Sequence, residues 1–346
     1  MPSVTIDSGV LAVPPSDCDE ETAYQYVDAL LDWRVLLSEP WVAIYMSENT
    51  CQLLFDEGLY PLRDHLRELF RVHGIDTYDV NTVARVVDNL LELTPSFETF
   101  FRLKDVLFDQ VNTEPDILQF STWKGLESDL ARCVILIAIL RNHCREPVQD
   151  HSLILRHSSA RCVTVQAMIH DIEHNRDDIV DVPKAPSFFR GDVLVCADFR
   201  GLINCLDAPA VLVASSDDVG VETAIRIALY KSRLERGLEP DWSDIGRLRL
   251  GKEFAERFRR VCADADTSLP DRALRAIVET IEKVNLAATH ALRTSPGGGA
   301  AQKTRGEDKA WRRDIDKQYH IHYWECADDT VELASLGVHN DFSIPG

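Results

Sequence analysis

The sequence lacks most of the motifs that assign a chain directly to a class of proteins. Its longest uninterrupted apolar run, residues 133–140, is far too short to cross a bilayer. The nine cysteines contain no CxxC pair, which disfavours a disulfide framework and a zinc ribbon. Neither a GxSxG nucleophile elbow nor a GxGxxG nucleotide fingerprint occurs. The N-terminus has no basic start followed by an apolar stretch, so we expect a cytoplasmic protein without membrane contact.

Positive charge is also scarce, and its distribution is uneven. The chain carries 37 Lys and Arg against 57 Asp and Glu, a net charge of −20. Residues 246–346 hold 16 groups of each sign, so the whole acidic excess lies in residues 1–245. An acidic surface repels phosphate backbones, which argues against direct nucleic-acid binding by this part and against a DNA partner. The excess could mask a basic surface, recruit a protein partner, or simply keep a helical domain soluble.

Apolar periodicity and turn residues predict an α+β protein with three parts. These are an acidic α-helical domain (1–148), a mixed α/β segment (149–245) and a small α+β domain (246–346). The first part contains predicted helices at 19–37, 61–74 and 80–93 and a short strand at 41–46. The second contains predicted strands at 153–155, 193–195 and 210–213, while residues 161–175 fit either a strand or a helix. The third combines a strand, two helices, a glycine-rich connection and a β-hairpin.

Two motif matches fail on physical grounds. Residues 170–174 read HDIEH, which matches the HxxEH pattern of inverted zinc metallopeptidases. On a helix, however, His170 and His174 would point away from the apolar face into solvent, so a polar surface is the favoured interpretation. Residues 246–253 imitate a GxxxxGK phosphate loop, but Glu253 replaces the Ser or Thr that would hold magnesium. A strand running into a helix explains that stretch better.

The final hairpin carries the strongest functional pattern. A two-residue turn at Asp328-Asp329 would pair Cys326 with Val331, Trp324 with Leu333, His322 with Ser335 and His320 with Gly337. Strand alternation then divides the side chains between two faces. His320, His322, Trp324, Leu333, Ser335 and His339 share one face; Tyr319, Ile321, Tyr323, Ala334, Leu336 and Val338 share the other. We expect the apolar face to lie on the helices and the histidine face to stay open.

An open histidine face beside cations has the composition of a metal-free RNA-cleaving site. His339, His320 and His322 could exchange protons while positive side chains hold a phosphodiester. The candidate substrate-binding residues are Arg312, Arg313, Lys303, Arg305, Lys309 and Trp311. Two alternatives stay open: a polar sheet face with incidental histidines, and a metal site built from His320, His322 and His339. We expect the site to work without a metal or another cofactor.

Residues 246–342 resemble the RelE/ParE toxin superfamily, especially its YoeB-like members. The resemblance lies in the element order and in Trp311, Arg313, Ile315, Tyr323 and His339. It implies a small antiparallel sheet packed on a helical hairpin, and either cleavage of mRNA, often at the ribosome, or a noncatalytic toxin. His339 matches the catalytic histidine of the family.

The sequence also departs from the pattern of this family. His320 stands where an arginine is usual, Asn340 replaces a terminal tyrosine, and the linker offers no obvious catalytic glutamate.

Two functions are therefore expected. In the first, the chain is a toxin-like or defence effector whose C-terminal domain cleaves RNA, with His339 and His320 transferring protons and Arg312 and Arg313 clamping phosphate. The acidic N-terminal part would restrain it or recruit a protein. In the second, the chain is a noncatalytic interaction subunit of a multi-protein assembly, such as a bacterial antiphage defence complex.

Overall fold

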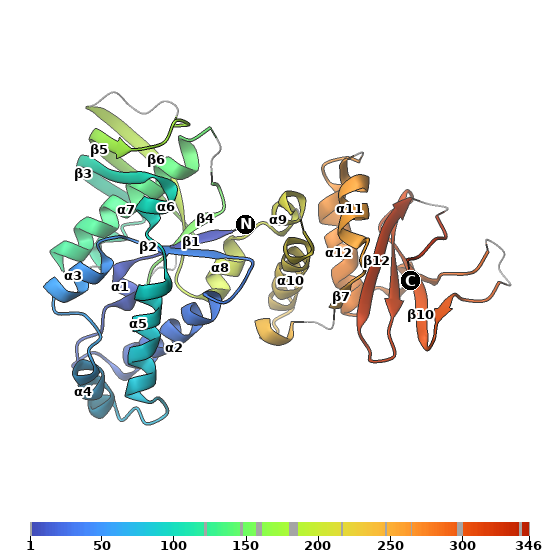
Figure 1. The fold of residues 1–346 in the computed structure, drawn as a ribbon, viewed down its shortest axis with the longest axis horizontal. Coiled ribbons are helices and arrows are strands. Elements are labelled where there is room, and N and C mark those ends of the chain that lie inside the picture. The colour runs from blue at the N-terminus through green and yellow to red at the C-terminus, as the bar shows by residue number, and fades with distance from the viewer. Residues whose placement is uncertain are drawn as a thin grey trace. The chain divides into compact units, whose positions relative to one another are not determined.

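The chain divides into two compact units, Pro2–Cys205 and Leu206–Gly346, in a computed structural model (Figure 1). The structure describes residues 2–120, 123–145, 148–156, 161–179, 186–215, 217–245, 248–263, 265–295, 300–338 and 341–345. Each unit combines helices with one mixed β-sheet, which agrees with the predicted α+β class at that level. The division falls between residues 205 and 206, whereas the sequence predicted boundaries at 148 and 245.

The first unit is built on a six-stranded sheet in the order β2-β1-β4-β6-β5-β3. Its strands are β1 (Ser3–Ile6), β2 (Ala43–Met46), β3 (Leu103–Glu114), β4 (His151–Ile154), β5 (Cys162–His174) and β6 (Ser187–Cys196). Strands β2, β1, β4 and β6 run parallel, and β5 is antiparallel to both β6 and β3. The sheet therefore joins strands from both the 1–148 and the 149–245 segments.

Several helices of this unit begin at a side-chain cap. They are α1 (Ser8–Leu11), α2 (Glu20–Leu36), α3 (Thr50–Asp56), α4 (Arg63–His73), α5 (Val80–Leu93), α6 (Phe97–Phe101), α7 (Lys124–Asn142) and α8 (Phe199–Cys205). Asp19 caps α2 by accepting from the backbone N–H of Thr22, and Asp79 caps α5 through the N–H of Thr82. These caps confirm the predicted starts of both helices.

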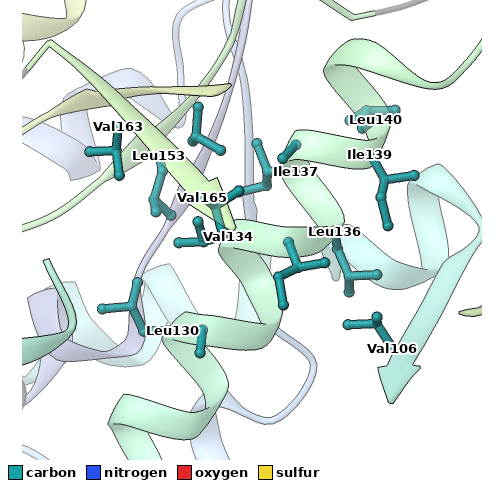
Figure 2. Packing of buried hydrophobic residues seen from close by; sticks show 14 of the residues in the cluster. Val106, Leu130, Val134, Leu136, Ile137, Ile139, Leu140, Leu153, Val163 and Val165 are labelled. Atoms are coloured by element: carbon teal, nitrogen blue, oxygen red, sulfur yellow. The ribbon is translucent and has the colours of Figure 1, made fainter. Parts of the chain in front are cut away.

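Helix α7 forms the centre of the core in the first unit. Its apolar run from Cys133 to Leu140 is at most 4% exposed at every residue, because the helix packs against the sheet. Figure 2 shows Val134 and Ile137 of α7 beside Val165 of β5, in the same buried cluster as Val163. Burial on all sides explains why this helix carries an uninterrupted apolar run, which an amphipathic surface helix would not have.

The second unit is built on a sheet in the order β7-β12-β11-β10-β8, with β9 paired to β10. The strands are β7 (Leu248–Leu250), β8 (Thr289–Ala291), β9 (Thr304–Arg305), β10 (Asp308–Asp314), β11 (Tyr319–Glu325) and β12 (Val331–Val338). The helices are α9 (Ala208–Ala214), α10 (Asp218–Glu235), α11 (Phe254–Ala263) and α12 (Leu269–Ile281). β7 runs parallel to β12, and the remaining pairs are antiparallel.

The structure replaces one predicted strand by a helix, settles one ambiguous stretch and contains a long strand that was not predicted. Residues 210–213, predicted as a strand, belong to helix α9, which Asp207 caps by accepting from the N–H of Ala210. The ambiguous stretch 161–175 forms strand β5, where every second residue from Val163 to Ile169 is buried. Strand β3 was not predicted at all.

The strand geometry of β5 removes the helical context assumed for the HDIEH motif. His170 donates from Nε2 to the carboxylate of Asp109 on the neighbouring strand, with His170 Nε2 2.7 Å from Asp109 Oδ2. In the ranges that the structure describes, no three His, Cys, Asp or Glu side chains are grouped so that they could hold a metal ion.

Across the described part of the chain, no helix combines the length and apolar character needed to traverse a lipid bilayer.

Candidate functional site

The histidine hairpin forms with the predicted register over only part of its length. His322 lies opposite Ser335 and His320 opposite Gly337, as predicted. A bulge between His322 and Tyr323 then shifts the pairing, so that Trp324 lies opposite Glu332 and not Leu333. Between the bulge and the turn, the side chains of β12 therefore lie on the face opposite to the one predicted. Ala334 packs in the apolar cluster of Trp324, while Leu333 lies opposite Tyr323.

The prediction of an open histidine face is wrong. His320 is 1% exposed and His322 is fully buried. Residues 341–345 run along β11 on this face, and their carbonyl oxygens bind its side chains at alternate positions. His320 Nε2 lies 3.4 Å from the carbonyl of Asp341, His322 Nδ1 2.7 Å from that of Ser343, and Trp324 Nε1 2.8 Å from that of Pro345. We call residues 341–345 the cover segment.

Apolar contacts hold the cover segment as well. Phe342 and Ile344 pack against a small buried cluster, Leu292, Ala310, Trp324, Cys326 and Ala334. Sequence alternation could not reveal this, because the segment has no strand pattern of its own and binds through its main chain. His339 and Asn340, which precede it, lie outside the described residues.

The environment of His322 keeps its imidazole neutral. Burial, and then the neighbouring His320, lower the pKa of His322 to about 4. A neutral ring whose Nδ1 faces a carbonyl oxygen must carry its proton on Nδ1, since the carbonyl can only accept. His322 Nε2 is buried and has no hydrogen-bond partner within the described part of the chain. This imidazole is therefore poorly suited to donating a proton at neutral pH.

Most of the predicted phosphate-binding cations are already engaged. Arg313 is fully buried and donates to the carbonyls of Val284 and Asn285, the hydroxyl of Thr289 and the carboxylate of Glu279. It thereby ties strand β10 to the end of helix α12 and to the connection that follows. Because this charge is buried and paired, its role is to hold the fold together.

The remaining predicted substrate-binding residues are dispersed. Arg305 pairs with Asp308 and Glu332 and lies over the ring of Trp324. Arg312 Nε lies 3.0 Å from Asp314 Oδ1, Lys303 donates to the carbonyl of Phe342, and the Trp311 indole donates to Glu325. Lys309 is the exposed member of the six residues. They form no single phosphate-binding cluster.

A buried polar network in the first unit was missed by the sequence reasoning. It lies where β2 ends and α7 begins its buried run. Asp129 of α7 accepts from Ser47 (3.0 Å) and from Asn49 (3.2 Å), while the guanidinium of Arg132 donates to Ser47 (2.8 Å), to Asp129 and to Glu98. Glu98 is 1% exposed and Asp129 5%. The sequence contained one sign of this network, the pair Asp129 and Arg132 just before an apolar run. It contained no sign of Glu98, which reaches Arg132 only in the folded chain.

Arg132 and its two carboxylates neutralise one another in part, which stabilises an otherwise costly group of buried charges. An adjoining cavity of about 730 Å³ is lined by groups of both signs, including Glu48, Arg102, Lys104 and Asp105. Lys104 is itself paired with Glu173 across its rim. The network is therefore a structural one beside an open, mixed-charge hollow.

Comparisons of the chain with protein-family models, curated proteins and solved structures found no match.

Proposed function

We propose that this protein is a noncatalytic interaction subunit of a multi-protein assembly, and that its RelE-like C-terminal unit serves as a binding module. The observation that carries this proposal is the closed histidine face. Both imidazoles are buried under the cover segment, and His322 is held neutral there. General acid–base catalysis needs a proton-transfer group within reach of its substrate and with a pKa near the working pH. His322 meets neither condition in this conformation.

The RelE-like description of the C-terminal unit remains part of this proposal. Its support is the order of a strand, two helices and a sheet, with α11 and α12 packed against strands of that sheet. The residues that carry the resemblance serve structural contacts: Arg313 clamps the connection after α12, and Trp311 binds Glu325. A toxin-like fold can thus be retained without its chemistry.

The partner that fits the chain carries a basic surface. The −20 charge excess lies in residues 1–245, and complementary charge accelerates and selects association between proteins. A bacterial antiphage defence complex is one setting for such a subunit.

The decisive experiment measures RNA integrity and growth when the full chain is produced in a bacterial host. We expect intact RNA and unimpaired growth for the wild type, for His339→Ala and for His322→Gln. RNA fragments that appear with the wild type and disappear with either variant would falsify the noncatalytic proposal. Lys309→Ala, which removes an exposed cation, serves as the matched surface control.

The role of acidic charge is tested separately, in complexes purified with a co-produced partner. Reversing Glu20 and Glu21, both exposed on α2, to lysine should weaken an association driven by charge and reduce its salt dependence. The matched control reverses Glu253 and Glu256 in the neutral C-terminal third. Equal binding by both variants would exclude these carboxylates as the contact.

RNA cleavage remains a second candidate, because the cover segment is weakly held. Its four hydrogen bonds to side chains of other segments, including the one from Lys303 to Phe342, contribute about 4 kcal/mol in total. Half-burial of Phe342 and Ile344 adds roughly 2 kcal/mol. Ordering the backbone of five residues costs about 5 kcal/mol or more. These contributions nearly cancel, so a modest competing interaction would open the histidine face.

Under this second candidate, the double variant Phe342→Asp with Ile344→Asp should expose His320 and His322 and release RNA cleavage. Cleavage by the double variant that is lost when His339→Ala is added would favour a restrained ribonuclease. Intact RNA with a demonstrably exposed His322 would exclude it.

A further inference from the structure

A second cavity lies at the carboxyl ends of β1 and β4, two adjacent parallel strands in the middle of the first unit's sheet. Asp7 directly follows β1, and its N–H donates to the carbonyl of Ile154 at the end of β4. The chain leaves β1 for β2 on one side, whereas β6 lies on the other side of β4. Parallel sheets bind ligands at such reversals of strand order, because the connections diverge and leave a crevice.

The body of this cavity is apolar. It has a volume of about 270 Å³ and is lined by Ala12, Val13, Ile117, Leu126, Leu130 and Leu155, with Pro15 exposed at its rim. Small-molecule sites commonly range from about 300 to 1,000 Å³, so the cavity suits a ligand at the small end of that range.

Two groups of opposite charge also line the cavity. The Asp7 carboxylate accepts from the N–H of Gly9 at 2.9 Å. The Arg156 guanidinium lies 4.9 Å from the centre of the Tyr26 ring, and its Nη2 donates to the carbonyls of Val10 and Ala12. Arg156 Nε is buried without a hydrogen-bond partner, and within the described residues no ion pair joins the guanidinium to Asp7.

Buried charges are stable when each has a partner, and an orphaned Arg N–H is among the more costly groups to leave unsatisfied. An apolar ligand would leave both charges without a partner. The carboxylate of Asp7 would repel an anion, and the guanidinium of Arg156 would repel a cation. A small zwitterion with an apolar body matches every part of the cavity.

We propose that this cavity binds a free α-amino acid with a large apolar side chain. Its ammonium group pairs with the carboxylate of Asp7, its carboxylate pairs with the guanidinium of Arg156, and its side chain fills the apolar body. This site belongs to the first unit and is independent of the proposed role of the histidine hairpin.

Calorimetric titration of the full chain with L-phenylalanine and L-leucine tests the proposal directly. Glycine, N-acetyl-L-phenylalanine and L-phenylalaninamide are the matched ligands; they lack the apolar side chain, the ammonium and the carboxylate, respectively. We expect each of the three to bind at least about tenfold more weakly than phenylalanine, since loss of one buried pairing exceeds the free energy of a tenfold change.

Two variants locate the site. Leu126→Trp should fill the cavity and abolish phenylalanine binding, whereas Leu93→Trp, the same substitution at a residue 64% exposed on α5, should leave binding unchanged. Asp7→Asn should bring the affinities for phenylalanine and N-acetyl-phenylalanine together.

The proposal fails if neither amino acid binds, if N-acetyl-phenylalanine binds as tightly as phenylalanine, or if a folded Leu126→Trp variant binds normally. The ligand comparison uses the unaltered chain, so its result stands even if Leu126→Trp does not fold.

Discussion

Asp7 gives the first unit an unusual dependence of stability on pH. Burial, together with the nearby negative charge of Asp129, raises the pKa of the Asp7 carboxyl from 3.8 to about 7. Below pH 3.8 the carboxyl is protonated in both the folded and the unfolded chain, and it costs no stability. Above this pH the unfolded chain ionises first, so the free energy of unfolding falls until the folded carboxyl ionises near pH 7.

The full pKa difference corresponds to a loss of roughly 4 kcal/mol. Between about pH 5 and pH 8 the loss amounts to about 3 kcal/mol, because part of it has already occurred at the lower pH. Asp7→Asn removes the titration but keeps an oxygen that can accept from Gly9. The variant should therefore gain about 3 kcal/mol relative to wild type over this pH range.

Hydrogen exchange measured by mass spectrometry on peptides from β1 and β4 reports the stability of this unit alone, which suits a chain of two units. Asp17→Asn, at an exposed position, controls for the loss of a surface carboxyl. If wild type and Asp7→Asn lose protection in parallel between the two pH values, the reasoning about Asp7 is refuted.

Three further outcomes are expected. Arg132→Met should destabilise the first unit by about 3–5 kcal/mol in urea unfolding, because it leaves Glu98 and Asp129 buried without their cation; a loss below about 1 kcal/mol would contradict this role. Arg313→Met should destabilise the second unit by several times more than Arg312→Met at the neighbouring, half-buried position, and equal losses would argue against the clamp. Phe342→Asp with Ile344→Asp should raise the pKa of His322 from about 4 toward its ordinary 6.5, measured by NMR titration of the ring protons; an unchanged pKa would mean that another part of the chain buries this ring.

Local signals in the sequence predicted local structure well. Caps at Asp19 and Asp79 marked the starts of α2 and α5, and the pairing of His322 with Ser335 followed from the turn and the alternation. The prediction of a strand at residues 210–213 was wrong because four apolar residues suit a strand and a short helix equally well, and the cap at Asp207 was overlooked.

The parts that sequence could not supply depend on contacts between distant residues. Glu98 of α6 meets Arg132 of α7 only in the folded unit, and Asp7 and Arg156 line one cavity only because β1 and β4 are neighbours in the sheet. The cover segment shows a different difficulty. Its bonds use backbone carbonyls, so residues 341–345 display no polar pattern matching His320, His322 and Trp324.

The bulge after His322 reverses the alternation of side chains between the two faces of β12. Side chains alternate between the two faces of a strand, so a face can be assigned to Leu333 by counting from either end of β12. Counting from the turn at Asp328 and counting back from Val338 give opposite faces, because each count is valid only on its own side of the bulge. Deleting Ala334 would restore one alternation throughout β12. It would leave Leu333 opposite Tyr323, but it would remove the side chain that packs in the cluster of Trp324, so the extra residue lets β12 contribute to both faces at the same point of the hairpin.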